Sequence, residues 1–237
     1  GREGATASVR GGQVLRAARV DVPADISSAA FFLVAAAICP GSDLVLRHVG
    51  MNPTRIGVLH VLRAMGADIT ESNPQLVGGE PVADLHVRGG RLKGITIDPA
   101  GVPLAIDEFP ALFIAAACAE GVTELRGAEE LRVKESDRIQ VMADGLAAVG
   151  LPVTVLPDGM RIEGRGGEAH PFAGGTVEAH GDHRIAMSFT VAALRSRGPL
   201  HIRATANVAT SFPGFVALAR SVGLDVSVAK GDCAGRR

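Results

Sequence analysis

Three aspartates stand just before three apolar, alanine-rich stretches, and they are the first candidates for chemistry. They are Asp25, Asp107 and Asp182. An aspartate before a helix is usually a cap that accepts hydrogen bonds from the backbone N–H groups of the first turn, which is the simplest interpretation of each one. Three helix starts at the same end of a domain would also gather positive dipole ends, which attract anions. The pattern therefore predicts helix caps and, if the starts converge, an anion-binding face.

Basic residues near two of these starts would add charge to that face. Lys134 and Arg138 are four residues apart in a stretch that we expect to open a helix, so both would face the same side. Cations at a helix start oppose the dipole, which favours ligand binding over a solvated, self-paired helix end. Arg184 begins the next apolar helix, and its planar guanidinium suits a carboxylate or phosphate. The residues expected on one face are Asp107, Lys134, Glu135, Arg138, His183 and Arg184, with Asp25 as an accessory residue, and this set suits a polyanionic small substrate and proton transfer.

The histidines and cysteines give little support to a metal or redox centre. His180 and His183 have a two-residue spacing but no third ligand nearby, so we expect no metal. Cys39, Cys118 and Cys233 are odd in number and lack metal-ligand spacing, which argues against a disulfide scaffold and favours a reducing cytoplasm. Cys39 and Cys118 are best interpreted as small buried thiols.

Composition excludes several classes of protein. The 237 residues are 47% hydrophobic and carry 24 basic and 25 acidic side chains, so the chain should fold around a sizeable core. A net charge of −1 offers no basic excess for a nucleic acid. The longest apolar run, residues 29–39, is too short to span a bilayer, and no leader-like segment opens the chain. We therefore expect a globular protein without a nucleic-acid or membrane partner.

A threefold repeat of elements is predicted to position the candidate residues. Buried helices are expected at residues 29–37, 110–117 and 185–194, each ended by a glycine suited to a left-handed cap and followed by a short strand at 43–47, 122–126 or 200–203. Amphipathic helices are expected at 56–65, 139–149 and 215–222, and strands at 67–70, 151–155 and 224–228. Residues 157–159 signal a hairpin, and residues 13–20 an opening strand. The fold class is α/β with pseudo-threefold architecture.

Several of these stretches together resemble one known family. Residues 131–138 read Leu-Arg-Val-Lys-Glu-Ser-Asp-Arg and residues 182–187 read Asp-His-Arg-Ile-Ala-Met, a specific combination. Residues 25–29, 51–55, 106–110 and 209–213 add to it. The match, from about residue 14 to residue 228, resembles the second class of the 5-enolpyruvylshikimate-3-phosphate synthase family, which includes glyphosate-insensitive bacterial members.

The resemblance implies a fold and a domain organisation. The family has two similar domains, each built from three βαβαββ units around buried parallel helices. Residues 1–22 would be the tail end of the N-terminal domain and residues 23–237 the C-terminal domain, with repeats at about 23–100, 101–170 and 171–237. The chain would be the C-terminal half, a fragment that needs its missing N-terminal half. We expect the full-length protein to be a cytoplasmic monomer.

The resemblance also implies a reaction and residue roles. The enolpyruvyl group of phosphoenolpyruvate would pass to the 5-hydroxyl of 3-phosphoshikimate with release of phosphate, in the shikimate pathway to chorismate and aromatic amino acids, without a cofactor. Asp107 would take the proton of that hydroxyl and also contact 3-phosphoshikimate, while Glu135 would handle the proton at the methylene carbon. Lys134 would contact both substrates. Arg138 and Arg184 would hold phosphoenolpyruvate.

Two other functions stay open at this point. One is the related transfer of enolpyruvyl to UDP-N-acetylglucosamine, which shares the fold. The other is a non-catalytic anion-binding half-domain. Residues 131–138 and 182–187 match the shikimate enzymes better, which favours the first hypothesis.

Overall fold

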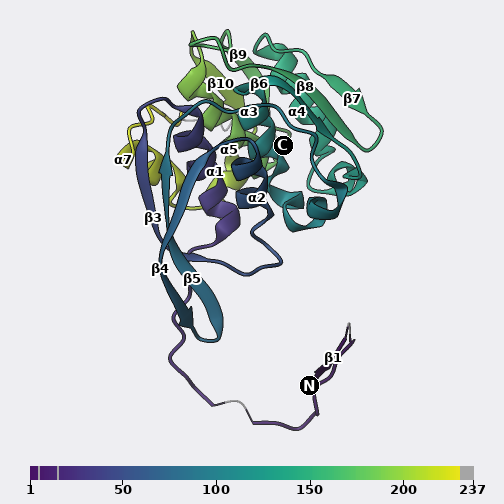
Figure 1. The fold of residues 1–237 in the computed structure, drawn as a ribbon, viewed down its shortest axis with the longest axis vertical. Coiled ribbons are helices and arrows are strands. Elements are labelled where there is room, and N and C mark those ends of the chain that lie inside the picture. Colours follow the sequence, from purple (N-terminus) through teal and green to yellow (C-terminus); the bar gives the residue numbers. More distant parts are fainter. Residues whose placement is uncertain (5, 15, 230–237) are drawn as a thin grey trace, which may run out of the picture.

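Three helices lie at the centre of the molecule and pack against one another. A computed structural model describes residues 1–4, 6–14 and 16–229. The central helices are α1 (Ile26–Ile38), α3 (Phe109–Ala117) and α5 (His183–Ala192), which is followed by the 3-10 turn η4 (Ala193–Arg195) (Figure 1). Alanine and larger apolar residues occupy all sides of α1 and α3, so these helices need no solvent-facing side. The three predicted interior helices are confirmed.

Sheets and outer helices surround this centre (Figure 1). One antiparallel sheet has the order β3-β5-β4 and a second the order β6-β8-β7, while β9 and β10 form a parallel pair and β1 and β2 an antiparallel one. The strands are β1 (Arg2–Glu3), β2 (Thr6–Ala7), β3 (Asp43–Gly50), β4 (Asp68–Val77), β5 (Glu80–Arg88), β6 (Glu120–Leu125), β7 (Thr154–Leu156), β8 (Gly159–Arg165), β9 (Gly175–Glu178) and β10 (Leu200–Arg203). The hairpin predicted at residues 157–159 is the β7–β8 turn.

The amphipathic helices also form where the pattern predicts them. They are α2 (Gly57–Ala64), α4 (Arg138–Ala148) and α7 (Phe215–Ser221), with an unpredicted short helix α6 (Ala206–Ser211). Glycines in the left-handed region follow all three: Gly66, Gly150 and Gly223. Gly198 has no positive φ, so the left-handed stop expected there is wrong: α5 ends at Ala192 and passes into η4, which ends at Arg195. Short 3-10 segments complete the chain: η1 (Pro99–Leu104), η2 (Ile106–Glu108) and η3 (Glu129–Val133).

Two predicted strands are absent. Residues 13–14 and 16–20 are exposed, and the segment leads away from the body of the molecule (Figure 1); Leu15 lies outside the described residues. Residues 224–228 follow α7 without strand pairing. An apolar alternation becomes a strand only when another backbone supplies the ladder, and none of the described residues does so at either place. Across the described ranges, no helix has the length and apolar character needed to cross a membrane.

Candidate functional site

The first turns of the three central helices meet at one end of the molecule. Ser27 of α1 donates its Oγ hydrogen to Glu108 Oε1, just before α3. Arg184 of α5 donates from Nη1 to the backbone oxygen of Asp107 at 3.0 Å. The predicted convergence of the helix starts is therefore confirmed, and with it a gathering of amide dipole ends.

The three aspartates at this end have different partners. Asp25 accepts from Ser28 N at 2.9 Å and Asp182 accepts from Arg184 N at 2.9 Å, so both are caps as expected. Asp107 lies in η2 and caps nothing. Pro110, three residues after Asp107, has no N–H to donate as Ser28 N does to Asp25, and the carboxylate of Asp107 binds cations.

Three cations surround Asp107. Its Oδ1 lies 3.4 Å from Lys134 Nζ and 3.2 Å from Arg138 Nη1, and Arg184 binds its backbone oxygen. Partial burial raises the pKa of the Asp107 carboxyl, but the charges of Arg184, Lys134 and Arg138 outweigh burial and hold that pKa below its ordinary value. Asp107 is therefore ionised at neutral pH, as a proton acceptor must be.

Arg138 gathers the acidic residues of the site. Its side chain is 1% exposed, and all three guanidinium nitrogens bind carboxylates: Nε binds Asp182 Oδ2 at 2.9 Å, Nη1 binds Asp107, and Nη2 binds Glu135. Asp182 is fully buried and also accepts from Ser136 Oγ at 3.0 Å. Burial alone would raise the pKa of the Asp182 carboxyl. Its bonds to Arg138, Arg184 N and Ser136 outweigh burial, so that pKa lies below its ordinary value. One guanidinium thus joins residues that are far apart in the sequence.

One argument from spacing is wrong. Lys134 has extended backbone, and α4 begins only at Arg138, because Asp137 caps Gln140 N at 3.0 Å. The two cations do not share a helical turn, although both reach Asp107. Lys134 also pairs with Glu130. This bond raises the pKa of Lys134 above its ordinary value, although partial burial acts in the opposite direction.

The two accessory residues lie at the edge of this cluster. His183 is half-buried at the first position of α5, where burial and then the charge of Arg184 lower its pKa, so its imidazole is neutral at pH 7. Asp25 Oδ1 lies 3.1 Å from Arg55 Nη2, and both side chains are about half exposed. Arg55 Nη2 also donates to Ser27 Oγ at 2.9 Å.

Sequence reasoning missed Glu108, Ser27 and Arg55. Glu108 is buried, and its partners come from α1 and α5. The available signal was a carboxylate flanking an apolar helix, since a buried acid requires a partner. Those partners are brought together only by the packing of the helices.

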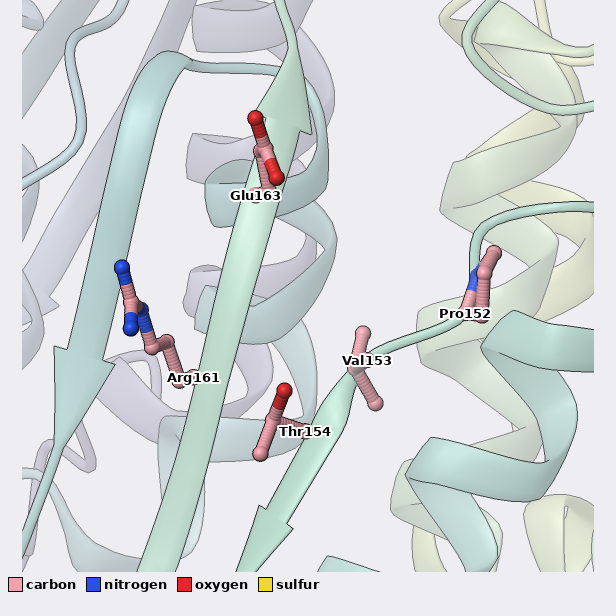
Figure 2. Close-up of a pocket in the computed structure, with 5 residues that line it drawn as sticks. All are labelled: Pro152, Val153, Thr154, Arg161 and Glu163. Carbon is pink, nitrogen blue, oxygen red and sulfur yellow. The ribbon is translucent and has the colours of Figure 1, made fainter.

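Other features of the molecule lie outside this cluster. No group of three or more His, Cys, Asp or Glu side chains suited to a metal is found among the residues described. Burial raises the pKa of the half-buried Cys39 thiol and raises that of the buried Cys118 thiol to about 12. Both thiols are therefore protonated at neutral pH. Cys233 lies outside the described residues. A groove of about 260 Å³ lies beside β7 and β8. Figure 2 shows the five residues that line it, Pro152, Val153, Thr154, Arg161 and Glu163, none of which is a candidate site residue.

Comparisons with known proteins agree on one family. The family model for EPSP synthase (3-phosphoshikimate 1-carboxyvinyltransferase) matches residues 2–218. The 3-phosphoshikimate 1-carboxyvinyltransferases of Methylococcus capsulatus and Alkalilimnicola ehrlichii are 63% and 61% identical, over 96% and 99% of this chain and 51% of each relative. The chain spans about half the length of the curated relatives it matches.

Solved structures show the same similarity. An EPSP synthase from Acinetobacter baumannii superposes with a TM-score of 0.90 at 55% identity, covering 96% of this chain and 54% of that one. The enolpyruvyl transferase NikO from Streptomyces tendae matches with a TM-score of 0.61 at 21% identity, over 84% of this chain and 43% of that one, which shows a shared α/β fold alone.

Proposed function

The chain belongs to the EPSP synthase family, and from that premise we propose that it forms the acid–base and phosphoenolpyruvate-binding half of a 3-phosphoshikimate 1-carboxyvinyltransferase. The reaction transfers the enolpyruvyl group of phosphoenolpyruvate to the 5-hydroxyl of 3-phosphoshikimate and releases phosphate. The observation that carries this proposal is that the Asp107 carboxylate contacts Lys134 and Arg138 while Arg184 binds the backbone oxygen of the same residue.

The proposed chemistry needs one proton on the methylene carbon of phosphoenolpyruvate and an oxygen nucleophile on the neighbouring carbon. Asp107 takes the proton of the 5-hydroxyl as its oxygen attacks, and Glu135, which takes up a proton once it leaves Arg138, delivers that proton to the methylene carbon. The tetrahedral intermediate then loses phosphate, which carries away the proton held by Asp107, and Glu135 takes back a proton from the new methyl group to regenerate the double bond. Both carboxylates lie on Arg138, which holds them on one side of the site.

The cations neutralise two anionic substrates bound side by side. Lys134 contacts both substrates, and Arg184 and Arg138 hold phosphoenolpyruvate. Arg138 already binds three carboxylates, so the substrate carboxylate displaces the most exposed of them, Glu135, whose side chain is 52% exposed. Displacement releases Glu135 toward the methylene carbon.

The domain organisation belongs to the same proposal. Residues 1–22 are the tail end of an N-terminal domain, and residues 23–237 are the C-terminal domain with βαβαββ repeats at about 23–100, 101–170 and 171–237. The missing N-terminal half completes the 3-phosphoshikimate site, and the full-length protein works as a cytoplasmic monomer. Two observations support this: the chain spans about half of its relatives, and its first 22 residues are exposed wherever the structure describes their side chains.

Phosphate release tests the proposal. It is measured with both substrates for the chain alone and after addition of a separately produced N-terminal half. We expect turnover only in the mixture. Substantial turnover by the chain alone contradicts the need for a second half.

A second measurement separates the enzyme from a half-domain that only binds anions. Calorimetry with phosphoenolpyruvate is run on the mixture, on the chain and on Arg184→Ala. Binding that Arg184→Ala abolishes, with no turnover in any mixture, favours the anion-binding half-domain instead.

A further inference from the structure

Glu108 is a buried acid that does nothing for its own helix. Its side chain is 5% exposed, and it occupies the cap position of α3 without accepting any backbone hydrogen there. Burial raises the pKa of its carboxyl, opposed by the bond from Ser27 and the charge of Arg184. Burying a carboxylate is costly unless it gains partners, so those partners indicate its role.

The partners of Glu108 come from the two other central helices. Ser27 of α1 donates to Oε1, and Arg184 Nη1 of α5 lies 3.6 Å from the same oxygen. Ser27 Oγ also accepts from Arg55, in the loop before α2. Glu108 therefore lies between the start of α1 and the guanidinium of Arg184.

Only one nitrogen of the Arg184 guanidinium, Nη1, has acceptors among the described residues. Its Nη1 binds the Asp107 backbone oxygen and faces Glu108. Neither Nε nor Nη2 of Arg184 has an acceptor among the residues that the structure describes. Those two nitrogens form an edge suited to a carboxylate or phosphate that binds with two parallel hydrogen bonds.

We propose that Glu108 is a positioning residue that fixes the guanidinium plane of Arg184, with Ser27 holding the Glu108 carboxylate in place, so that the Nε–Nη2 edge is presented to an anion. That the anion is phosphoenolpyruvate rests on the proposed function. The fixing of Arg184 does not depend on it.

Side-chain NMR of Arg184 tests the positioning directly. In the unsubstituted chain, we expect slow rotation about the guanidinium bonds of Arg184, because its Nη1 is held by the Asp107 backbone oxygen and faces Glu108. Glu108→Gln keeps the size of the side chain and an acceptor for Ser27 but removes the charge, and we expect rotation at least about tenfold faster, as a charge-assisted contact is lost. Asp84→Asn is the matched control, because Asp84 is a poorly exposed acid whose partners, His48 N, Asn73 and Arg47, do not include Glu108, Ser27 or Arg184.

Phosphoenolpyruvate affinity gives the second readout, in the chain and in its mixture with the N-terminal half. We expect Glu108→Gln to weaken binding about tenfold, the scale for a misaligned bidentate contact, and Asp84→Asn to leave it unchanged. Unaltered Arg184 rotation in Glu108→Gln, with only a loss of stability, overturns the proposal and makes Glu108 a structural tie between helices. Faster rotation, with no binding of phosphoenolpyruvate by the chain or by its mixture with the N-terminal half, supports the positioning and refutes the proposed function.

If Glu108→Gln does not fold, Ser27→Ala answers the same question. It frees the Glu108 carboxylate from α1 without removing its charge. We expect an intermediate increase in Arg184 rotation, and rotation equal to that of the unsubstituted chain contradicts the proposal.

Discussion

At the scale of residues, neighbours rather than residue type separate three aspartates that look alike in the sequence. Asp25 and Asp182 accept backbone hydrogens at the starts of their helices, whereas Asp107 precedes a proline and binds side-chain cations. The cations hold the pKa of Asp107 down, so its carboxylate is available as a base over the whole neutral range. These cations set Asp107 apart from the two capping aspartates, which is why we propose it as the proton acceptor.

Asp107→Asn keeps the shape of the side chain and removes its basicity. We expect turnover of the mixture with the N-terminal half to fall by about 10²–10⁴, the usual contribution of a positioned acid or base. Asp144→Asn, at an exposed position of α4, is the control. Turnover by Asp107→Asn equal to that of the control shows that the proton goes elsewhere.

Asp182 should make stability depend on pH in acid. Its folded pKa is lowered, so its stabilising contribution is complete above the ordinary carboxyl pKa of about 3.9 and is lost as pH falls through the folded value. Asp182→Asn breaks a buried ion pair and should cost about 3–5 kcal/mol at pH 7. Urea unfolding of the unsubstituted chain and of Asp182→Asn measures the difference in their free energies of unfolding, and this difference should shrink below pH 4. If the difference in free energy of unfolding stays constant with pH, the ion pair between Asp182 and Arg138 is not its source.

At the scale of elements, glycines let strands lie directly on the central helices. A Cβ at Gly164 of β8 would lie 2.2 Å from the Ala119 oxygen and 2.3 Å from the Ala116 oxygen, both backbone atoms at the end of α3. The adjoining backbone is bonded there too, since Gly166 N donates to Ala119 O at 2.9 Å. This close contact helps to set the position of α3, and with it the positions of Asp107 and Glu108 at its other end.

Gly164→Ala should therefore destabilise the fold. Two backbone carbonyls cannot yield as a side chain can, so we expect a loss of about 1–3 kcal/mol in the free energy of unfolding, the range for overpacking. Gly90→Ala is the control because a Cβ there meets nothing within 4 Å. Equal stability of the two variants in denaturant unfolding contradicts the close packing of β8 on α3.

At the scale of the whole molecule, the first twenty residues contribute little to the folded body. The β1–β2 pair and the segment after it are exposed where their side chains are described, and they lead away from the central helices (Figure 1). Attachment begins near Ala24, whose N donates to His48 O at 2.8 Å and whose O accepts from Gly50 N at 2.9 Å. This arrangement fits our proposal that the segment packs against an N-terminal half.

Deleting residues 1–20 should leave the free energy of unfolding within about 0.5 kcal/mol, as for changes that remove no buried contact. Deleting residues 1–25 also removes the Ala24 bonds and the Asp25 cap, and should cost about 1 kcal/mol or more. Thermal and urea unfolding of both truncated chains measure the difference. A large loss of free energy of unfolding on deletion of residues 1–20 shows that this segment does stabilise the rest of the molecule.

Elements that arise from local interactions could be predicted from the amino-acid sequence. Unbroken apolar stretches made α1, α3 and α5 interior helices, and aspartates before two of them became caps, because periodicity and capping involve residues within a few positions of one another. Motifs determined the family, and they brought Asp107, Lys134, Glu135, Arg138 and Arg184 onto one list of candidates.

The contacts among those residues could not be predicted in the same way, because they join segments that are far apart in the chain. Arg138 joins Asp107 and Asp182 across 31 and 44 positions of the chain, and Glu108 finds Ser27 across 81. The expected strands at residues 13–20 and 224–228 failed for the same reason, since a strand needs another backbone beside it and the local pattern does not say whether one is there. Charge pairing and strand pairing both depend on groups distant in sequence, and the packing of the helices and sheets is what sets those distances.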